Sequence, residues 1–213
     1  MERSHLWSKL ANTVFMAKLP DNADAVFVHA FDTLLDDLLK EAAVLSGRFG
    51  DIPIVLNGAT EYETGGRGVA YARSQLETYG VAPRLIVATP TALQTREEAE
   101  AFSEYAQEHS IKTVVILTLP PHVVRAYLTD LFSFQSRNLV TQLVPRTIPV
   151  HWDDEVTITG LISTLETTSF LGRVFSECAR IMEYRQRYEG GDIAYSIATI
   201  QEGLDHSRGF CSK

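Results

Sequence analysis

The stretch Thr118-Leu-Pro-Pro-His122-Val-Val-Arg125-Ala126 combines the side chains with the clearest chemistry in the sequence. His122 and Arg125 are three residues apart, so they share one face if the segment is helical. They lie in the first turn of a helix predicted from Pro121, where unpaired backbone amides attract an anion. An arginine beside such amides is a good clamp for a carboxylate or a phosphate. The spacing alone leaves open that Arg125 pairs with a nearby acid and that His122 caps the turn.

Two further stretches combine hydrogen-bonding side chains with turn residues. In the segment of residues 94–99, Thr95 and Glu98 have capping-box spacing, which stabilises a helix start without any ligand. Asn57-Gly58 opens a glycine-rich segment, and glycines let a backbone approach a ligand closely or turn with positive φ. This segment has neither G-x-G-x-x-G nor Walker A spacing, which argues against a standard dinucleotide or P-loop site. It is either a flexible lid or a long surface loop.

Histidine and acidic side chains gather in two other segments. His29 and Asp32 follow the first predicted strand, and His151 and Asp153 follow the fifth. Such nitrogen and oxygen groups could hold a metal ion, but no H-E-x-x-H or comparable spacing supports one. Solvated acidic loops are the alternative, so the sequence leaves a metal site open.

The elements that must position these residues alternate between short apolar runs and helical patterns. The predicted strands are residues 25–28, 52–56, 85–87, 113–117 and 139–144. The predicted helices between them are residues 34–49, 68–79, 95–109 and 121–134. This alternation predicts an α/β, Rossmann-like three-layer domain with a mostly parallel five-stranded sheet and C-terminal helices. Ligands of such sheets bind beyond the carboxyl ends of the strands, where the stretches described above lie.

The length of the chain suggests one domain with an appendage. Residues 1–150 are predicted to form the Rossmann-like domain, with an N-terminal helix over residues 4–18. Residues 151–213 are predicted to be a helical extension that packs on it, with one or two helices over 161–188 and a last helix over 193–204. These C-terminal helices could instead form a contact in a homo-oligomer.

Composition limits the class of partner. Of the 213 residues, 45% are apolar and 22% are charged, as in an ordinary globular protein, and the net charge of −8 argues against nucleic acid. The two cysteines, Cys178 and Cys211, are far apart, as expected for reduced thiols. The apolar run in the first twenty residues is too short and too polar to span a membrane. We therefore expect a cytoplasmic protein that binds a small molecule and neither nucleic acid nor a membrane.

Taken in order, the motifs of residues 23–150 resemble those of the YdcF-like family, which includes the SanA and ElyC envelope proteins. The family's first strand, which follows an Ala-Asp pair, resembles residues 23–28, and its small-Gly turn after the second strand resembles Asn57-Gly58. Its Leu-x-x-x-Gly-Val stretch resembles residues 76–81. Its Asn-Thr-x-Glu-Asn-Ala motif resembles residues 94–99, and its Thr-x-x-x-His-x-x-Arg-Ala motif resembles residues 118–126.

The resemblance implies a Rossmann-like fold with a site on this rim for S-adenosylmethionine or a nucleotide. Carried over position by position, it implies cofactor binding by Asn57, Gly58, Thr95, Thr118 and Arg125, and catalytic roles for His122 and Glu97. The chain departs from the family pattern at residues 29–32, which replace a glycine-rich turn, and at Glu98, which replaces an asparagine. The membrane anchor of the envelope members is not expected here.

Three functions follow as hypotheses. The first is a protein that binds S-adenosylmethionine or a nucleotide and acts as a transferase on a small metabolite. In it Arg125 holds an anionic group, Glu97 binds a hydroxyl or amine such as that of a ribose, and His122 is a general acid or base. The second is a phosphoesterase or pyrophosphate hydrolase, with or without a metal ion. The third is a non-enzymatic partner protein.

Overall fold

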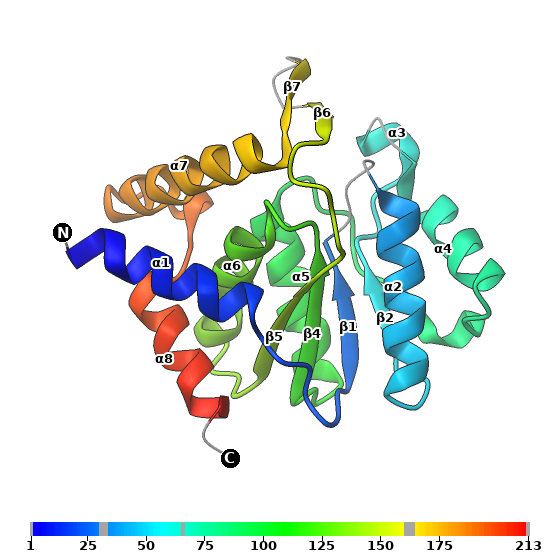
Figure 1. The fold of residues 1–213 in the computed structure, drawn as a ribbon. Helices are drawn as coiled ribbons and strands as arrows, with labels where there is room; N and C mark the ends of the chain where they lie inside the picture. Colours follow the sequence, from blue (N-terminus) through cyan, green and yellow to red (C-terminus); the bar gives the residue numbers. More distant parts are fainter. Residues whose placement is uncertain (1, 30–33, 65–66, 160–164, 212–213) are drawn as a thin grey trace.

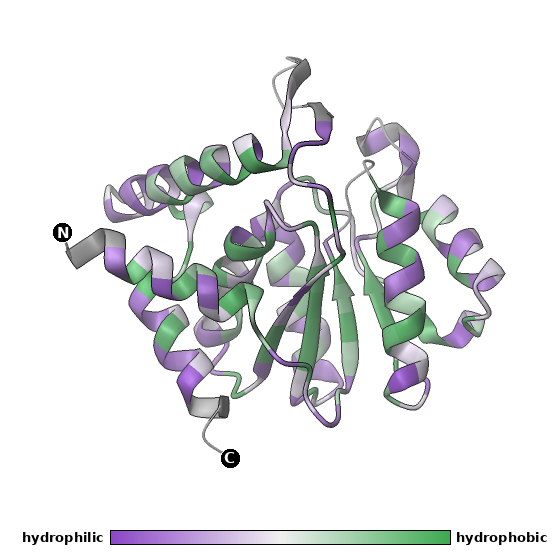
Figure 2. Cartoon of the chain, in the orientation of Figure 1, coloured by the Kyte–Doolittle hydropathy of each residue, from purple (hydrophilic) through white to green (hydrophobic). Residues whose placement is uncertain are grey.

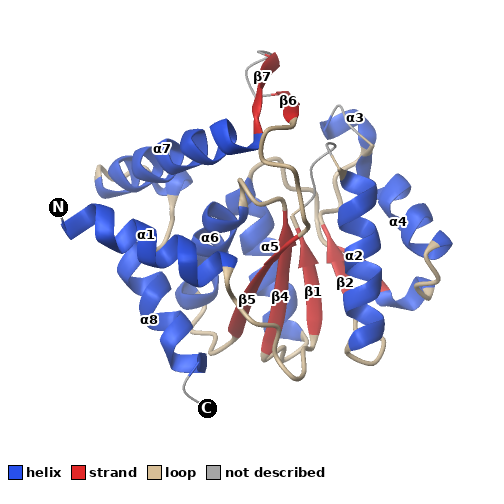
Figure 3. Cartoon of the chain, in the orientation of Figure 1, coloured by secondary structure: helices blue, strands red, loops and turns tan. Residues whose placement is uncertain are grey.

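The computed structural model of the chain describes residues 2–29, 34–64, 67–159 and 165–211. Its centre is a five-stranded, all-parallel sheet with the strand order β3-β2-β1-β4-β5 (Figures 1 and 3). The strands are β1 (Ala25–Val28), β2 (Ile54–Leu56), β3 (Ile86–Ala88), β4 (Thr113–Thr118) and β5 (Gln142–Thr147). The predicted Rossmann-like three-layer architecture is therefore confirmed.

Helices cover both faces of this sheet. One face carries α2 (Leu35–Arg48) and α4 (Gly68–Thr78). The other face carries α1 (Glu2–Phe15), α5 (Thr95–Glu108), α6 (Val123–Ser136) and α8 (Ile200–Cys211). The connections also contain the short helices α3 (Glu61–Thr64), η1 (Pro83–Leu85) and η2 (Ile193–Tyr195). The predicted N-terminal helix is present, although it begins and ends earlier than residues 4–18.

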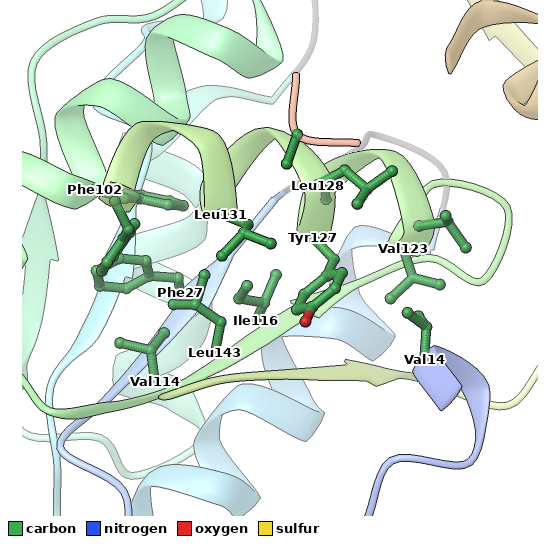
Figure 4. Close-up of a cluster of buried hydrophobic side chains, with 14 of the residues drawn as sticks. Val14, Phe27, Phe102, Val114, Ile116, Val123, Tyr127, Leu128, Leu131 and Leu143 are labelled. Carbon is green, nitrogen blue, oxygen red and sulfur yellow. The ribbon is translucent and has the colours of Figure 1, made fainter. Parts of the chain in front are cut away.

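Burial on both faces explains why the strands are continuous apolar runs rather than alternating ones. Successive side chains of a strand point to opposite faces, so Phe27 packs under α5 and α6 while Val26 packs under α2. The rings of Phe27 and Phe102 lie 4.2 Å apart between their centroids, inside the cluster drawn in Figure 4. Figure 2 shows the corresponding pattern, with apolar strands inside and helices of mixed polarity around them.

The strand order reverses between β1 and β4. The chain passes from β1 to β2 and β3 on one side, then returns to the other side of β1 as β4. Val28 and Leu117 are register partners near the carboxyl ends of these two strands. Because the connections leave these ends in opposite directions, this is the switch point where ligands of open α/β sheets bind.

The C-terminal part differs from its prediction. The expected helix over residues 161–188 is wrong in its first part, because β6 (Glu155–Thr159) and β7 (Leu165–Ser169) form an antiparallel pair there. Threonine-rich segments favour strands over helices. Helix α7 spans Phe170–Glu189 and begins where the Ser169 hydroxyl accepts a hydrogen bond from the Gly172 amide. The last helix, α8, also begins later than expected.

Within the described ranges, no helix combines the length and apolar character that crossing a bilayer requires. The domain boundary at residue 150 and a homo-oligomer formed through the C-terminal helices stay predictions.

Candidate functional site

His29 directly follows β1 and lies beside β4. Its backbone is fixed on the neighbouring strand, because its amide donates to the Leu117 carbonyl and its carbonyl accepts from the Thr118 hydroxyl at 3.1 Å. The buried imidazole lies between two carboxylates. Its Nδ1 is 3.0 Å from Glu98 Oε2, and its Nε2 is 2.9 Å from Asp130 Oδ2.

This arrangement stabilises the protonated imidazole. Burial alone would lower the pKa of His29, but the charge and hydrogen bond of Asp130, followed by those of Glu98, outweigh it and raise the pKa to about 10. Both ring nitrogens of an imidazolium are donors, so each carboxylate accepts one hydrogen bond. His29 is therefore a buried cation at neutral pH.

Asp130 is the innermost member of this group. It lies in the second half of α6 and is fully buried. Burial raises the pKa of its carboxyl group, against the opposing effect of the His29 charge. Among the described residues its Oδ1 has no hydrogen-bond partner, whereas Oδ2 accepts from His29. A buried acid of this kind is costly to the fold unless it is paired, so His29 is its main stabilising partner.

Asn57 connects Glu98 to the loops that follow β2 and β3. Its side-chain amide nitrogen donates to Glu98 Oε1 at 3.1 Å and to the Ala92 carbonyl at 2.7 Å. Its side-chain oxygen accepts from the amides of Ala59 and Ala92. The side chain of Asn57 therefore fixes both loops and holds one oxygen of Glu98, while His29 holds the other.

Gly58 has a packing role, and the cofactor-binding role predicted for it is untested. A Cβ atom placed on it would lie 1.9 Å from the carbonyl oxygen of Thr89. Only glycine lets the loop after β2 pass this close to the backbone of the loop after β3.

The two glutamates at the start of α5 have different partners. The predicted capping box of Thr95 and Glu98 is wrong by one residue, because the capping residues are Gln94 and Glu97. Glu97 Oε2 accepts from the amides of Leu93 at 2.7 Å and Gln94 at 3.2 Å. The Glu97 carboxylate is thus engaged in stabilising the helix start, while Glu98 reaches the buried site. The catalytic role predicted for Glu97 is untested.

Arg125 lies in the first turn of α6 and is held by an acid from another helix. Its Nε donates to Glu177 Oε2 of α7, and its Nη1 donates to the Thr95 hydroxyl at 2.8 Å. Arg125 is 5% exposed and Glu177 is 3% exposed, so the pair is almost fully buried. Because the Thr95 oxygen accepts from Arg125, its hydroxyl can donate its own proton to another acceptor.

Helix α7 contributes two more guanidinium groups to the same carboxylate. Arg173 Nη2 lies 3.1 Å and Arg180 Nη1 lies 3.5 Å from Glu177 Oε1. Burial would raise the pKa of Glu177, but His122 and Arg125 outweigh it and hold this pKa far below its usual range. Glu177 is therefore a charged carboxylate surrounded by cationic groups.

His122 lies between the two groups of charges. Its Nδ1 is 3.6 Å from Glu177 Oε2, and its ring meets that of His29 edge to face at 5.9 Å. Burial and then the charge of Arg125 lower the pKa of His122 to about 3, although Glu177 opposes them. The imidazole is neutral at pH 7, and a pKa of about 3 makes it a weak base for the predicted acid–base role.

The structure therefore brings most of the predicted residues to one place. Asn57, Thr95, Thr118, His122 and Arg125 lie in or beside a buried polar network with His29, Glu98, Asp130 and Glu177. His29 joins it at the end of β1, and Glu177 joins it from α7. In this network the His29 imidazolium lies between the carboxylates of Glu98 and Asp130. Nearby, the Glu177 carboxylate is surrounded by arginines.

No predicted metal site is evident in the described ranges. They contain no group of three or more histidine, cysteine, aspartate or glutamate side chains arranged to hold a metal ion. His151 and Asp153 are exposed, and Asp32 lies outside the described residues. Whether a metal binds stays open.

Sequence reasoning missed three acids in the network. Asp130 stands in a predicted helix between Leu128 and Leu131, and an isolated acid beside such apolar residues is a signal that could have identified it. Glu98 was regarded only as a capping residue. Glu177 carries no local signal, because it reaches the site through a helix far along the chain.

The chain matches no family model, and no curated protein matches it. The resemblance to the YdcF-like family accordingly stays a prediction.

Proposed function

We propose that this chain binds a small molecule with an anionic group, S-adenosylmethionine or a nucleotide, at the carboxyl ends of β1 and β4. On this proposal it acts as a transferase on a small metabolite. The resemblance of residues 94–99 and 118–126 to YdcF-like motifs favours the same ligands, and we propose membership of that family with it.

One observation carries the proposal: a buried network of charged side chains lies at the switch point of the sheet. Buried ion pairs contribute little to stability compared with apolar packing of the same volume. The fold gains little from burying Asp130 with His29, or Glu177 with Arg125. Clustered titratable groups with strongly perturbed pKa values are typical of functional sites, and this network lies where such sheets bind ligands.

Each part of the network has a role in this proposal. Arg125 and Thr95 bind the anionic group of the ligand through charged and neutral hydrogen bonds. Glu98 accepts a hydrogen bond from a hydroxyl or amine group of the ligand. Its side chain is 13% exposed, whereas the side chains of His29 and Asp130 are buried. His29 and Asp130 orient Glu98 and keep its charge balanced.

Adjacent glutamates of α5 offer a matched test. Binding of S-adenosylmethionine and of ATP is measured by isothermal titration calorimetry for the wild type, Glu98→Gln and Glu97→Gln. A lost hydrogen bond to a charged group is worth about 1.5–3 kcal/mol, so we expect Glu98→Gln to weaken binding at least about tenfold. Glu97→Gln should bind like the wild type, because glutamine can also complete a capping box.

Thermal melting of both variants shows whether they are folded. Equal affinity in Glu98→Gln and the wild type would refute the role of Glu98. Absence of heat with both ligands in the wild type would refute the proposed ligands.

A further inference from the structure

Glu177 is an acid from α7 inserted into the rim on which the proposed function depends. Its Oε2 accepts from Arg125 Nε, and the same arginine donates to Thr95. These are the two residues proposed to bind the ligand's anionic group. The acid therefore engages one of the donors that the ligand needs.

The surroundings of this carboxylate are those of an anion-binding site. Arg125, Arg173 and Arg180 all contact it, and two of these guanidinium groups are almost fully buried. Converging arginines are the usual means by which proteins bind phosphate and carboxylate groups. The carboxylate also lies near the first turn of α6, where the helix dipole favours negative charge.

Helix α7 is attached in a way that permits release. Its buried residues are Phe170, Arg173, Glu177 and Ile181, so half of its buried positions are charged rather than apolar. Its other side exposes Leu171, Phe175 and Met182. Figure 1 shows α7 on the side of the molecule toward which the strand arrows point, where ligands of such sheets bind. Phe170 and Ile181 pack in the apolar clusters, so the ionic contacts of Glu177 are the part of this attachment that a competing anion can replace.

We propose that the Glu177 carboxylate occupies the position of the ligand's anionic group, so that a phosphate or carboxylate group binds Arg125 and Thr95 by displacing it. Helix α7 is then a lid that the ligand itself releases. This inference rests on the proposed function, because it concerns the same site, and it adds the competition between an internal and an external anion.

Inorganic phosphate is the probe, since it supplies the anionic group alone. Its affinity is measured by isothermal titration calorimetry for the wild type, Glu177→Gln and Glu183→Gln. Glu183 is the matched control, because it lies on the same helix, is exposed, and has its carboxylate 3.6 Å from the surface residue Arg187. We expect Glu177→Gln to bind phosphate at least about tenfold more tightly than the wild type. Glu183→Gln should not differ from the wild type.

A second variant keeps the test decisive if Glu177→Gln does not fold. Glu177→Asp retains the charge but shortens the side chain by one methylene, so it should also bind phosphate more tightly than the wild type. Hydrogen exchange gives an independent readout. Phosphate should speed exchange of the amides of residues 174–188 in the wild type, whereas an acid that only anchors α7 would leave this exchange unchanged or slower.

Equal or weaker phosphate affinity in the Glu177 variants, including no binding in any protein, would overturn the lid. That result is separable from the proposed function. If the Glu177 variants do not bind phosphate more tightly, while Glu98→Gln loses affinity for S-adenosylmethionine or ATP, the proposed function stands and the lid is refuted. If Glu177→Gln binds phosphate more tightly but the wild type binds neither S-adenosylmethionine nor ATP, the competition at Glu177 is supported and the proposed ligands are refuted.

Discussion

The protonated state of His29 should make stability fall as the pH rises above neutrality. The group has a pKa near 6.5 when unfolded and about 10 in the fold, so the folded state retains a proton that the unfolded state has lost. Its contribution is fully present below pH 6.5 and disappears as the pH passes about 10. Each pKa unit is worth about 1.4 kcal/mol, so this contribution declines by about 1.4 kcal/mol per pH unit and by about 5 kcal/mol in all.

Urea unfolding at pH 6.5, 7.5, 8.5 and 9.5 measures this decline as a change in the free energy of unfolding. The same series on His29→Gln removes the titrating group. That variant should be less stable at pH 6.5, because it leaves Asp130 buried without its cationic partner, and its stability should change much less with pH. His151→Gln is the control for losing an exposed histidine and should follow the wild type.

The deciding quantity is the difference in the free energy of unfolding between the wild type and His29→Gln. We expect it to shrink by about 2 kcal/mol between pH 6.5 and 8.5, because the unfolded imidazole is already half deprotonated at pH 6.5. A difference that stays constant over this interval would show that His29 is neutral in the folded protein. The account of the two carboxylates as partners of an imidazolium would then be wrong.

Two further predictions concern the same rim. His122 stays neutral in the fold until about pH 3, so the unfolded state takes up a proton first as the pH falls below 6.5. In urea unfolding the wild type should lose about 2 kcal/mol more stability than His122→Gln between pH 6.5 and 4.5. Equal losses would contradict the buried neutral state of His122. Gly58→Ala should destabilise by about 1–3 kcal/mol in thermal or urea unfolding, because the new Cβ meets the Thr89 carbonyl. Gly47→Ala is the control, because a Cβ atom at that position has no neighbour within 4 Å, and it should be neutral or slightly stabilising. A Gly58→Ala variant as stable as Gly47→Ala would refute the close approach of Gly58 to the Thr89 carbonyl.

The fold was predictable because its signals are local. Each strand of the parallel sheet is an apolar run of its own, and each helix between strands has its own period and end signals. The part that failed was residues 165–169, which pair with residues 155–159 as antiparallel strands although they were predicted to lie in a helix over residues 161–188. Strand pairing depends on a partner elsewhere in the chain, so a single segment does not reveal it.

The site was predictable only in part, for the same reason. The rule for parallel sheets placed His122, Arg125 and Thr95 on one rim, and their contacts with the network agree with that placement. The contacts within the network join residues that are distant in the sequence. Glu177 is 52 positions from Arg125, and Asp130 is 101 positions from His29. Neither separation follows from spacing. The choice between Glu97 and Glu98 depended on the capping residue, which is Gln94 rather than the predicted Thr95, so that Glu97 and not Glu98 completes the capping box.

The two histidines of the rim are held in opposite protonation states by their neighbours, and this defines the charge that a ligand meets. His29 carries a proton whose charge is balanced by Asp130 and Glu98, and that same charge helps to keep His122 neutral. With His29 balanced and His122 uncharged, the arginines are the cationic groups left to attract an anion, and Glu177 is the anion they hold in this structure. Displacing Glu177 would leave these arginines without the acid that balances their charge. A ligand that replaces Glu177 therefore has to supply the negative charge itself, which is the physical reason for expecting a phosphate or carboxylate group at this position.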